Sequence, residues 1–492
     1  MGVSTVPSDV AAVLTREGGR PSAAASRPRR MPWTALCLIA SDSLSVVAAS
    51  WLGVELWGLV NPAVSPAHVF PPAALAALFV TVYVAFGLYA PAGIDPVEEL
   101  RRIVLATALV SLVSMAAIFL AKEGESYSRG AFLVAGALTA VLAPLGRAVL
   151  RSRLAAKPWW GAPVLILGGG PAAAAVAESL LRRPQLGLKP VGYLSDGGPL
   201  APPGGLPRLG APADARAVGA RFGIRRVIAA MPELGPARLG EILERHTAGF
   251  AQVTVVPDLA GAGSVWVAAR DLGGVLGLEI RRNLLNPVNR VLKRAVDVSV
   301  GLALAIATLP LVAAATLWIK CKSPGPALFR QTREGCGGRP IHIVKLRTMR
   351  PDAGRLLERH LRASPEARRE WERFCKLKDD PRVIPGAGRL LRRFSIDELP
   401  QLWSVVRGEM SLVGPRPLPA YHLERFPPRF RALRRKVRPG LTGLWQVEAR
   451  SDADLALQQK LDTYYIRNWS IWLDLYILAR TFGAVLRGRG AY

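Results

Sequence analysis

Long apolar runs separated by short polar connections dominate the first third of the chain. Each of four runs has about 20 residues or more, the length at which a helix crosses the hydrocarbon core of a bilayer. The runs cover Pro32–Val60, Val69–Tyr89, Ile103–Ala121 and Ala131–Leu150. The pattern predicts an α-helical bundle of four transmembrane helices over residues 31–155, after a polar tail at residues 1–30 that we expect to be disordered and cytoplasmic.

The charges between these runs predict the orientation of the bundle. The tail is basic, whereas the connection at residues 61–68 carries no charged side chain. The second connection contains Arg101 and Arg102, and the end of the fourth run carries Arg147, followed by Arg151, Arg153 and Lys157. Because cytoplasmic connections hold the excess of Lys and Arg, both ends of the bundle are predicted to lie in the cytoplasm.

Two acidic residues, Asp42 and Glu55, fall within the first apolar run. Carboxylates inside a membrane are costly and often functional. We expect structural roles here, with Asp42 bonded to a neighbouring helix and Glu55 reaching the membrane interface.

After the bundle, residues 160–262 alternate short apolar runs with helical segments. Strands are predicted near Val164–Leu167, Pro190–Ser195, Val227–Met231 and Val253–Val256. This alternation is typical of a parallel, doubly wound α/β sheet, so a Rossmann-like domain is expected. The turn Gly168-Gly169-Gly170 resembles the dinucleotide fingerprint, with Ala173 in the third place. Two interpretations stay open: a nucleotide site, or a scaffolding fold.

Residues 263–288 are predicted to be a linker, and residues 289–492 a third domain. This domain opens with an apolar run at about residues 292–320, which has basic residues at both ends and Pro310 in its middle. A straight spanning helix would place the strongly basic C-terminal part outside the cell. A helix broken at Pro310 would instead dip into one leaflet and return. The residues alone leave both arrangements open.

Composition narrows the classes of partner. Half of the 492 residues are hydrophobic, the mean hydropathy is +0.24 and the formal net charge is +28. These values indicate a membrane protein that binds anionic headgroups or phosphate-bearing substrates. The sequence contains no nucleic-acid-binding pattern. The four cysteines and five histidines are scattered, which predicts neither a disulfide framework nor a histidine metal site.

Two adjacent carboxylates, Asp397 and Glu398, lie in one of the most arginine-rich parts of the chain. Arginines bind phosphates, a carboxylate can attack phosphorus, and a divalent metal can screen the charge between them. The alternative interpretation is a solvated acidic turn paired with nearby arginines. The surrounding motifs favour the chemical interpretation.

These motifs are short and distinctive. They are Lys345-Leu346-Arg347-Thr348-Met349, Asp380-Pro381-Arg382, Asp397-Glu398-Leu399-Pro400-Gln401, Gly414-Pro415-Arg416-Pro417 and Val437-Arg438-Pro439-Gly440-Leu441-Thr442-Gly443-Leu444-Trp445-Gln446-Val447. Together they resemble the bacterial sugar transferase domain of the polyprenyl-phosphate hexose-1-phosphate transferases. Four spans before a Rossmann-like domain resemble the long, monotopic-core phosphoglycosyl transferases. The linker residues 271–278 and 283–287 are similar to the undecaprenyl-phosphate galactose phosphotransferase branch.

The resemblance implies an α/β catalytic domain that transfers a hexose-1-phosphate from a UDP-sugar to undecaprenyl phosphate and releases UMP. It implies a ping-pong cycle in which Asp397 is the nucleophile, Glu398 is its partner and both hold Mg²⁺. The implied substrate-binding residues are Lys345, Arg347, Arg392, Arg416, Arg333, Arg438 and Gln446. Pro310 matches the break of a re-entrant membrane helix.

The same resemblance implies the setting of the reaction. This would be the first membrane step of O-antigen, capsule or exopolysaccharide synthesis, on the cytoplasmic face of the bacterial inner membrane. The partners are undecaprenyl phosphate, a UDP-hexose, the bilayer and a second copy in a homodimer. Galactose is the expected sugar, with glucose as the alternative. We expect the basic residues at 434–436 to face lipid headgroups.

Two other functions compete with this hypothesis. A membrane-anchored NAD-dependent dehydratase would need a Tyr-x-x-x-Lys pair, and none of the nine tyrosines has a lysine four residues later. A non-catalytic scaffold of polysaccharide assembly would fit the spans and the Gly-rich turn. It would not need the motifs between Lys345 and Gln446.

Overall fold

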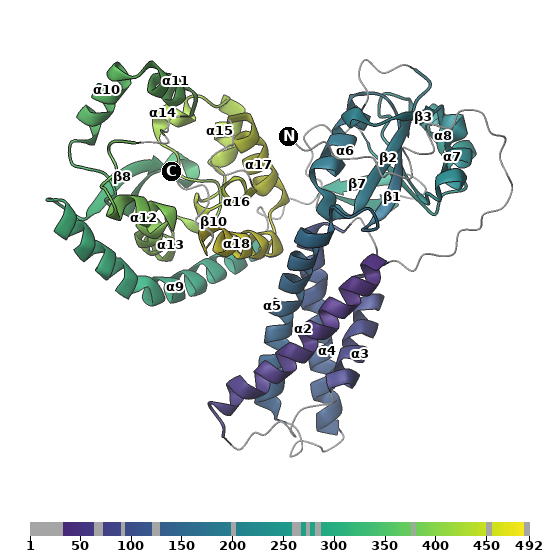
Figure 1. Ribbon diagram of the computed structural model, residues 1–492, viewed down its shortest axis with the longest axis horizontal. Coiled ribbons are helices and arrows are strands. Elements are labelled where there is room, and N and C mark those ends of the chain that lie inside the picture. The colour runs from purple at the N-terminus through teal and green to yellow at the C-terminus, as the bar shows by residue number, and fades with distance from the viewer. Residues whose placement is uncertain are drawn as a thin grey trace. The chain divides into compact units, whose positions relative to one another are not determined.

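The computed structural model divides the chain into two compact units, Met1–Ala260 and Gly261–Tyr492 (Figure 1). It describes residues 33–62, 72–89, 94–120, 128–197, 203–257, 267–271, 276–280, 287–374, 377, 380–448 and 455–486. The tail at residues 1–30 and most of the linker lie outside these ranges. Each unit is described by itself.

A bundle of four helices forms the first part of unit one. The helices are α2 (Trp33–Gly58), α3 (Pro72–Ala85), α4 (Pro96–Leu120) and α5 (Arg129–Leu154). They correspond to the four predicted apolar runs, and α2, α4 and α5 are long and apolar enough to cross a membrane. α3 is a shorter apolar helix of 14 residues. The length of the second span is therefore the main difference from the prediction.

A network of charges is buried where the four helices meet. The Arg147 guanidinium donates to both carboxylate oxygens of Asp42, at 3.0 and 2.5 Å, and to Glu99 Oε1 at 2.6 Å. It also donates to the carbonyl of Leu88, and Arg151 pairs with Glu99. The expectation that Asp42 bonds a neighbouring helix is confirmed. The interpretation of Arg147 as a flanking charge is wrong, because the residue lies within α5 and its side chain is buried among the helices of the bundle. Glu55 lies exposed near the end of α2.

A parallel sheet forms the second part of unit one. Its order is β3-β2-β1-β4-β5, with helices between the strands along the chain. This order, with strands added on both sides of β1, is that of a doubly wound fold, as predicted. The elements are β1 (Ala162–Leu167), α6 (Pro171–Arg182), β2 (Leu188–Leu194), β3 (Arg208–Gly210), α7 (Ala215–Phe222), β4 (Arg226–Ala229), α8 (Pro236–Thr247) and β5 (Gln252–Val255).

The Gly-rich turn after β1 is explained by packing within the fold. Gly168 has a φ of +120°, and a Cβ added there would lie 2.4 Å from the carbonyl oxygen of Ala230. A Cβ added at Gly170 would lie 2.9 Å from Glu233 Oε1. A carboxylate therefore lies beside the N-terminus of α6, where the fingerprint would place a pyrophosphate. These contacts favour the scaffolding interpretation of this domain.

Unit two begins with paired strands in the segment that was predicted to be a linker. β6 (Val267–Asp271) and β7 (Leu276–Ile280) form an antiparallel pair. The long helix α9 (Pro287–Lys322) follows. The later elements are β8 (Leu328–Glu334), β9 (Pro340–Leu346), α10 (Ala353–Ala363), α11 (Pro365–Phe374), α12 (Ala387–Arg393), the 3₁₀ helix η7 (Ile396–Gln401), α13 (Leu402–Arg407), β10 (Ser411–Val413), α14 (Ala420–Leu423), α15 (Pro428–Arg434), β11 (Gly440–Thr442), α16 (Leu444–Glu448), α17 (Leu455–Asn468) and α18 (Ile471–Leu486).

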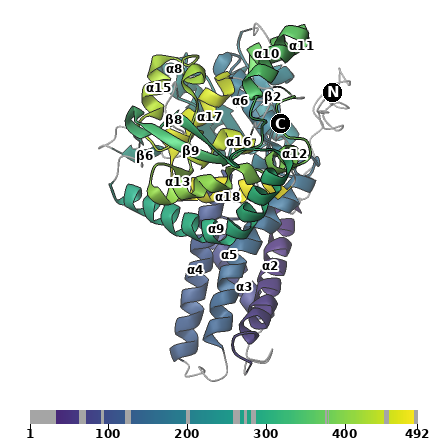
Figure 2. The same cartoon turned by 90° about the vertical axis from the view of Figure 1, so that its left-hand side faces the viewer.

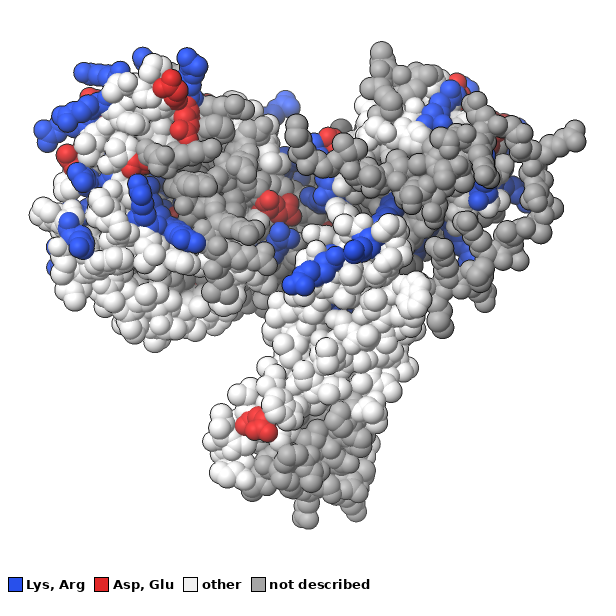
Figure 3. All heavy atoms as spheres, in the orientation of Figure 1, with Lys and Arg blue, Asp and Glu red and all other residues white. Residues whose placement is uncertain are grey.

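Helix α9 follows an arc along one side of unit two, opposite α10 and α11 (Figures 1 and 2). The chain stays helical through Pro310. The interruption predicted there is therefore a bend within one helix, because proline removes one helix hydrogen bond without ending this helix. Large apolar side chains such as Ile306 and Leu309 remain about two-thirds exposed on it. In Figure 3 the side of unit two that carries α9 is almost free of charged atoms.

Polar contacts fix the first turns of α9 to the rest of unit two. Lys293 Nζ donates to Asp474 Oδ2 at 2.6 Å, and Asp474 also accepts from the Tyr465 hydroxyl at 2.8 Å. The Arg294 guanidinium donates to the carbonyls at the end of α13. The basic residues before the apolar run therefore position α9, which the sequence pattern did not predict.

Candidate active site

A cavity of about 1020 Å³ opens in unit two, and both carboxylates of the predicted pair line it. Asp397 and Glu398 lie in η7, directly after α12. Between these helices Ser395 adopts a left-handed conformation with a φ of 54°. A non-glycine residue in that region costs about 1 kcal/mol. The turn brings the pair against β9, which carries Lys345.

Glu398 is held by two cations. Its Oε1 accepts from Lys345 Nζ at 2.6 Å and from Arg416 at 2.7 Å. Burial opposes its ionisation, but Arg416 and Lys345 outweigh burial and hold the pKa of Glu398 well below its usual range. Glu398 is therefore an ionised anchor that fixes two cations at the cavity wall.

Asp397 is in the opposite electrostatic situation. Its side chain lines the cavity, and the residue is only 9% exposed. Burial and the adjacent charge of Glu398 raise the pKa of Asp397 to about 6, against the opposing effect of Lys345, Arg392 and Arg416. The two carboxylates thus differ in role. Glu398 is held by two cations, whereas Asp397 has a pKa of about 6 and titrates just below neutral pH.

The structure brings most of the other predicted residues to the same cavity. Arg392 lines it and donates from Nε to Thr348 Oγ1 at 3.0 Å. Arg333 lines it with a buried Nε that has no hydrogen-bond partner among the described residues. Gln446 also lines the cavity, and its buried Oε1 likewise has no hydrogen-bond partner among the described residues. Both residues therefore belong to the cavity wall, and each keeps one polar atom buried.

Two predicted substrate-binding residues have other surroundings. Arg347 donates to the carbonyls of Ser323 and Pro324, at 2.9 and 2.7 Å. It therefore holds the turn after α9 while also lining the cavity wall. Arg438 is exposed and does not line the cavity. The geometry gives Arg347 a positioning role and gives Arg438 no contact with the pair.

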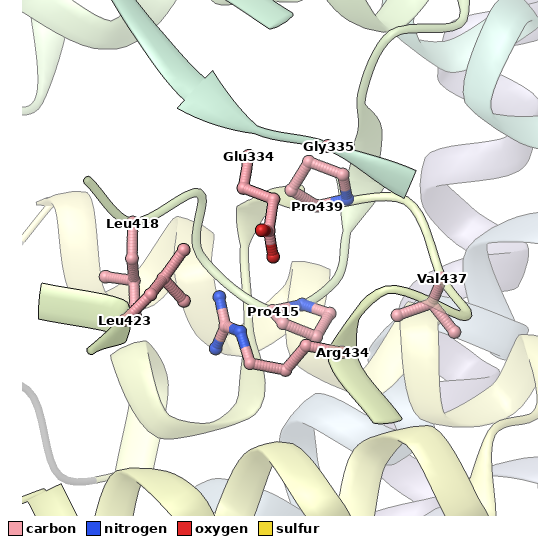
Figure 4. Close-up of a pocket in the computed structure, with 8 residues that line it drawn as sticks. All are labelled: Glu334, Gly335, Pro415, Leu418, Leu423, Arg434, Val437 and Pro439. Atoms are coloured by element: carbon pink, nitrogen blue, oxygen red, sulfur yellow. The ribbon is translucent and has the colours of Figure 1, made fainter. Parts of the chain in front are cut away.

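Arg434 does not belong to the expected basic patch facing lipid headgroups, whereas its neighbours Arg435 and Lys436 are exposed. Its side chain is buried, pairs with Asp462 and donates to the carbonyl of Arg416. Figure 4 shows it beside Pro415, around a space of about 10 Å³ that is no larger than one water molecule. Arg434 therefore supports the turn that presents Arg416 to Glu398.

The residues that line the cavity but were not among the predicted site residues include Trp371, Asp380 and Arg382. Asp380 and Arg382 form an ion pair at 2.6 Å, and the Arg382 guanidinium lies 5.1 Å from the centre of the Trp371 ring. The motif Asp380-Pro381-Arg382 was visible in the sequence. Its contact with Trp371 depends on how α11 packs, which no local pattern encodes.

The donor set fits a magnesium ion that is completed by substrate. Among the described residues, no group of three or more His, Cys, Asp or Glu side chains could hold a metal alone. Mg²⁺ is commonly bound through one or two carboxylates together with phosphates and water. Asp397 is the better ligand of the pair, because Glu398 Oε1 already accepts from two cations.

Known families match both units. The family described as "Bacterial sugar transferase" matches residues 288–488, and the one described as "CoA-binding domain" matches residues 84–257. The chain is 33% identical to a "UDP-galactose-lipid carrier transferase" of Erwinia amylovora, over 80% of this chain and 82% of that protein. It is 31% identical to an "Undecaprenyl-phosphate galactose phosphotransferase" of Salmonella typhimurium, over the same shares.

A third relative matches less than half of this chain at higher identity. It is a "UDP-glucose:undecaprenyl-phosphate glucose-1-phosphate transferase" of Caulobacter vibrioides, 44% identical over 41% of this chain and 72% of that protein. The resemblance inferred from the motifs is confirmed by these matches.

Proposed function

The chain belongs to the bacterial sugar transferase family, and we propose that it transfers a hexose-1-phosphate from a UDP-hexose to undecaprenyl phosphate with release of UMP. One observation carries the proposal. The wall of a large cavity holds the Asp397 carboxylate beside three cationic side chains, Lys345, Arg392 and Arg416. A nucleophile next to phosphate-binding cations is what transfer of a phosphoryl-linked sugar requires.

Asp397 acts in two displacements. Its carboxylate oxygen attacks the sugar-linked phosphorus of the donor, the bond from that phosphorus to the bridging oxygen breaks, and UMP leaves with that oxygen. A phosphate oxygen of undecaprenyl phosphate then attacks the same phosphorus and releases the Asp397 carboxylate. Each half forms one P–O bond and breaks one, so no further reactant is needed.

The other residues set up both displacements. Arg392, Lys345 and Arg416 bind the phosphate oxygens, because guanidinium and ammonium groups compensate the charge of the diphosphate. Glu398 keeps Lys345 and Arg416 in place through its two short contacts. Asp397, with Glu398 behind it, would hold Mg²⁺, which supplies charge neutralisation at the phosphates when bound.

Helix α9 brings this site to the membrane. We propose that it enters and leaves the cytoplasmic leaflet from one face, bending at Pro310. Its arc, its exposed apolar side chains and its basic residues at both ends support this arrangement. The bundle is proposed to span the bacterial inner membrane with both ends cytoplasmic, on the basis of its basic connections.

Galactose is the proposed sugar, and glucose is the alternative. The two relatives named for galactose transfer match 80% of this chain, whereas three relatives named for glucose transfer match between 41% and 67% of it. UMP release by the purified protein with Mg²⁺, undecaprenyl phosphate and each UDP-hexose in turn decides between them. Release with galactose alone would support the proposal. Release with neither sugar, nor with N-acetylated donors, would favour a non-catalytic scaffold.

The raised pKa of Asp397 predicts an acidic limit to the reaction. The nucleophile must be ionised, so UMP release should fall as the pH drops through about 6. Glu398→Gln removes the neighbouring charge that raises this pKa, so the acidic limb of its residual activity should move to lower pH. The measurement is kcat/KM for the donor between pH 5 and 8 for both proteins. A limb that stays in place in Glu398→Gln would contradict the assignment to Asp397.

A further inference from the structure

The two ends of the cavity in unit two differ in chemistry. One end is apolar and is formed by Leu304 of α9 together with Leu478, Phe482 and Val485 of α18. The other end is lined by Trp371 of α11 with Asp380 and Arg382. Figures 1 and 2 show α11 on the side of the unit opposite α9. The carboxylate pair and its cations line the same cavity.

Trp371 and Arg382 form a cation–π pair at the second end, and Arg382 is fixed there. Arg382 donates from Nε and a terminal nitrogen to the two oxygens of Asp380, at 2.7 and 2.6 Å. Its main-chain carbonyl accepts from the amide of Arg350 at 2.8 Å. With its guanidinium 5.1 Å from the Trp371 ring centre, Arg382 is held on both its polar edge and one face. Such a surface is already ordered before a ligand arrives.

The charge of this surface suits a base better than a phosphate. The Arg382 cation is compensated by a bidentate carboxylate, and the side chain of Asp380 is only 7% exposed. A phosphate approaching Arg382 would also approach that carboxylate. By contrast, nucleic-acid bases stack on indole rings and on guanidinium planes regardless of such compensation.

This surface also interacts electrostatically with the phosphate site. The charge of Arg392 interacts with both Asp380 and Asp397. Because Arg392 and Trp371 line the same cavity, a nucleotide donor whose phosphates contact Arg392 can extend its base toward Trp371. The apolar end near α9 and α18 remains for a lipid chain.

We propose that Trp371 and Arg382, fixed by Asp380, form the site for the base of the nucleotide donor. The proposal rests on the proposed function and adds the direction in which the donor binds. The base lies toward α11, the sugar-linked phosphorus lies at Asp397, and the acceptor's lipid chain lies toward Phe482. Stacking on one aromatic ring typically changes affinity by a factor of about 5 to 150.

Equilibrium binding of UMP to the full-length protein in detergent tests this proposal without turnover. Trp371→Ala should weaken UMP binding by about tenfold, and Trp371→Phe, which keeps an aromatic face, should stay within about threefold of the parent. Phe482→Ala is the matched control, since it removes an aromatic side chain from the apolar end of the same cavity. It should raise the KM for undecaprenyl phosphate and leave UMP binding unchanged.

The outcomes separate this inference from the proposed function. Loss of UMP affinity in Trp371→Ala, with affinity retained in Trp371→Phe and Phe482→Ala, supports the base site. Unchanged UMP affinity in a folded Trp371→Ala protein, or an equal loss in Phe482→Ala, overturns it. Parent protein that binds UMP but releases none from any UDP-sugar would overturn the proposed function while leaving the base site standing.

Discussion

Replacing Asp397 with asparagine is expected to lower the rate of UMP release by at least about 10⁴-fold, because removal of a covalent nucleophile commonly has effects of that order. The amide keeps the size of the side chain and removes only the charge and nucleophilicity. It also removes the neighbour that repels Glu398, so the contacts of Glu398 with Lys345 and Arg416 should persist. We expect a folded protein that retains donor binding.

The control for this experiment is Glu358→Gln. Glu358 is an exposed carboxylate of α10, with its side chain 72% accessible. Its substitution should leave turnover near the parent level, because surface changes away from the site are usually small. Turnover that survives in Asp397→Asn would mean that another group is the nucleophile, with Glu398 as the first alternative to examine.

Replacing Arg147 with methionine is expected to destabilise the helical bundle by about 3–5 kcal/mol, the cost of leaving buried charges without their partner. Arg147 is 1% exposed and compensates both Asp42 and Glu99. Without it, Asp42 loses its cationic partner in an apolar interior, where an unpaired carboxylate is especially costly, and Glu99 keeps only Arg151. Unfolding of the purified protein by denaturing detergent, followed by circular dichroism, measures the effect.

A matched substitution in the same helix controls for the loss of an arginine. Arg153 lies exposed in the last turn of α5. Arg153→Met should change stability by less than about 0.5 kcal/mol, as is usual for a surface position. If both variants unfold alike, the buried network is not what stabilises the bundle.

Arg147 also illustrates what the sequence could predict and what it could not. The lengths of the apolar runs identified four helices, because span length is a local property. The partners of Arg147 are Asp42 and Glu99, which are 105 and 48 residues away in the chain. A charge near the end of a run therefore looked like a flanking charge. Only the packing of the helices shows that the charge of Arg147 is compensated by Asp42 and Glu99 in the interior of the bundle.

The same distinction applies to the sheet and the active site. Four strands of the sheet in unit one were predicted from apolar runs, whereas β3, with the residues Arg208-Leu209-Gly210, has no such run and was missed. The carboxylate pair was found because its motifs are contiguous. Arg347 belongs to one of these motifs, yet it donates to main-chain carbonyls after α9. Every residue has a main-chain carbonyl, so the sequence could not predict these contacts. Trp371 was missed because its place in the cavity wall depends on the packing of α11.

The most direct test of the central claim is to look for the covalent intermediate. Full-length protein is incubated with Mg²⁺ and UDP-galactose or UDP-glucose in the absence of undecaprenyl phosphate, then digested and analysed by mass spectrometry. We predict that the peptide containing Asp397 gains the mass of one hexose phosphate, and that adding undecaprenyl phosphate removes it. Release of UMP with no such adduct on the Asp397 peptide, under conditions that preserve acyl phosphates, would contradict the account.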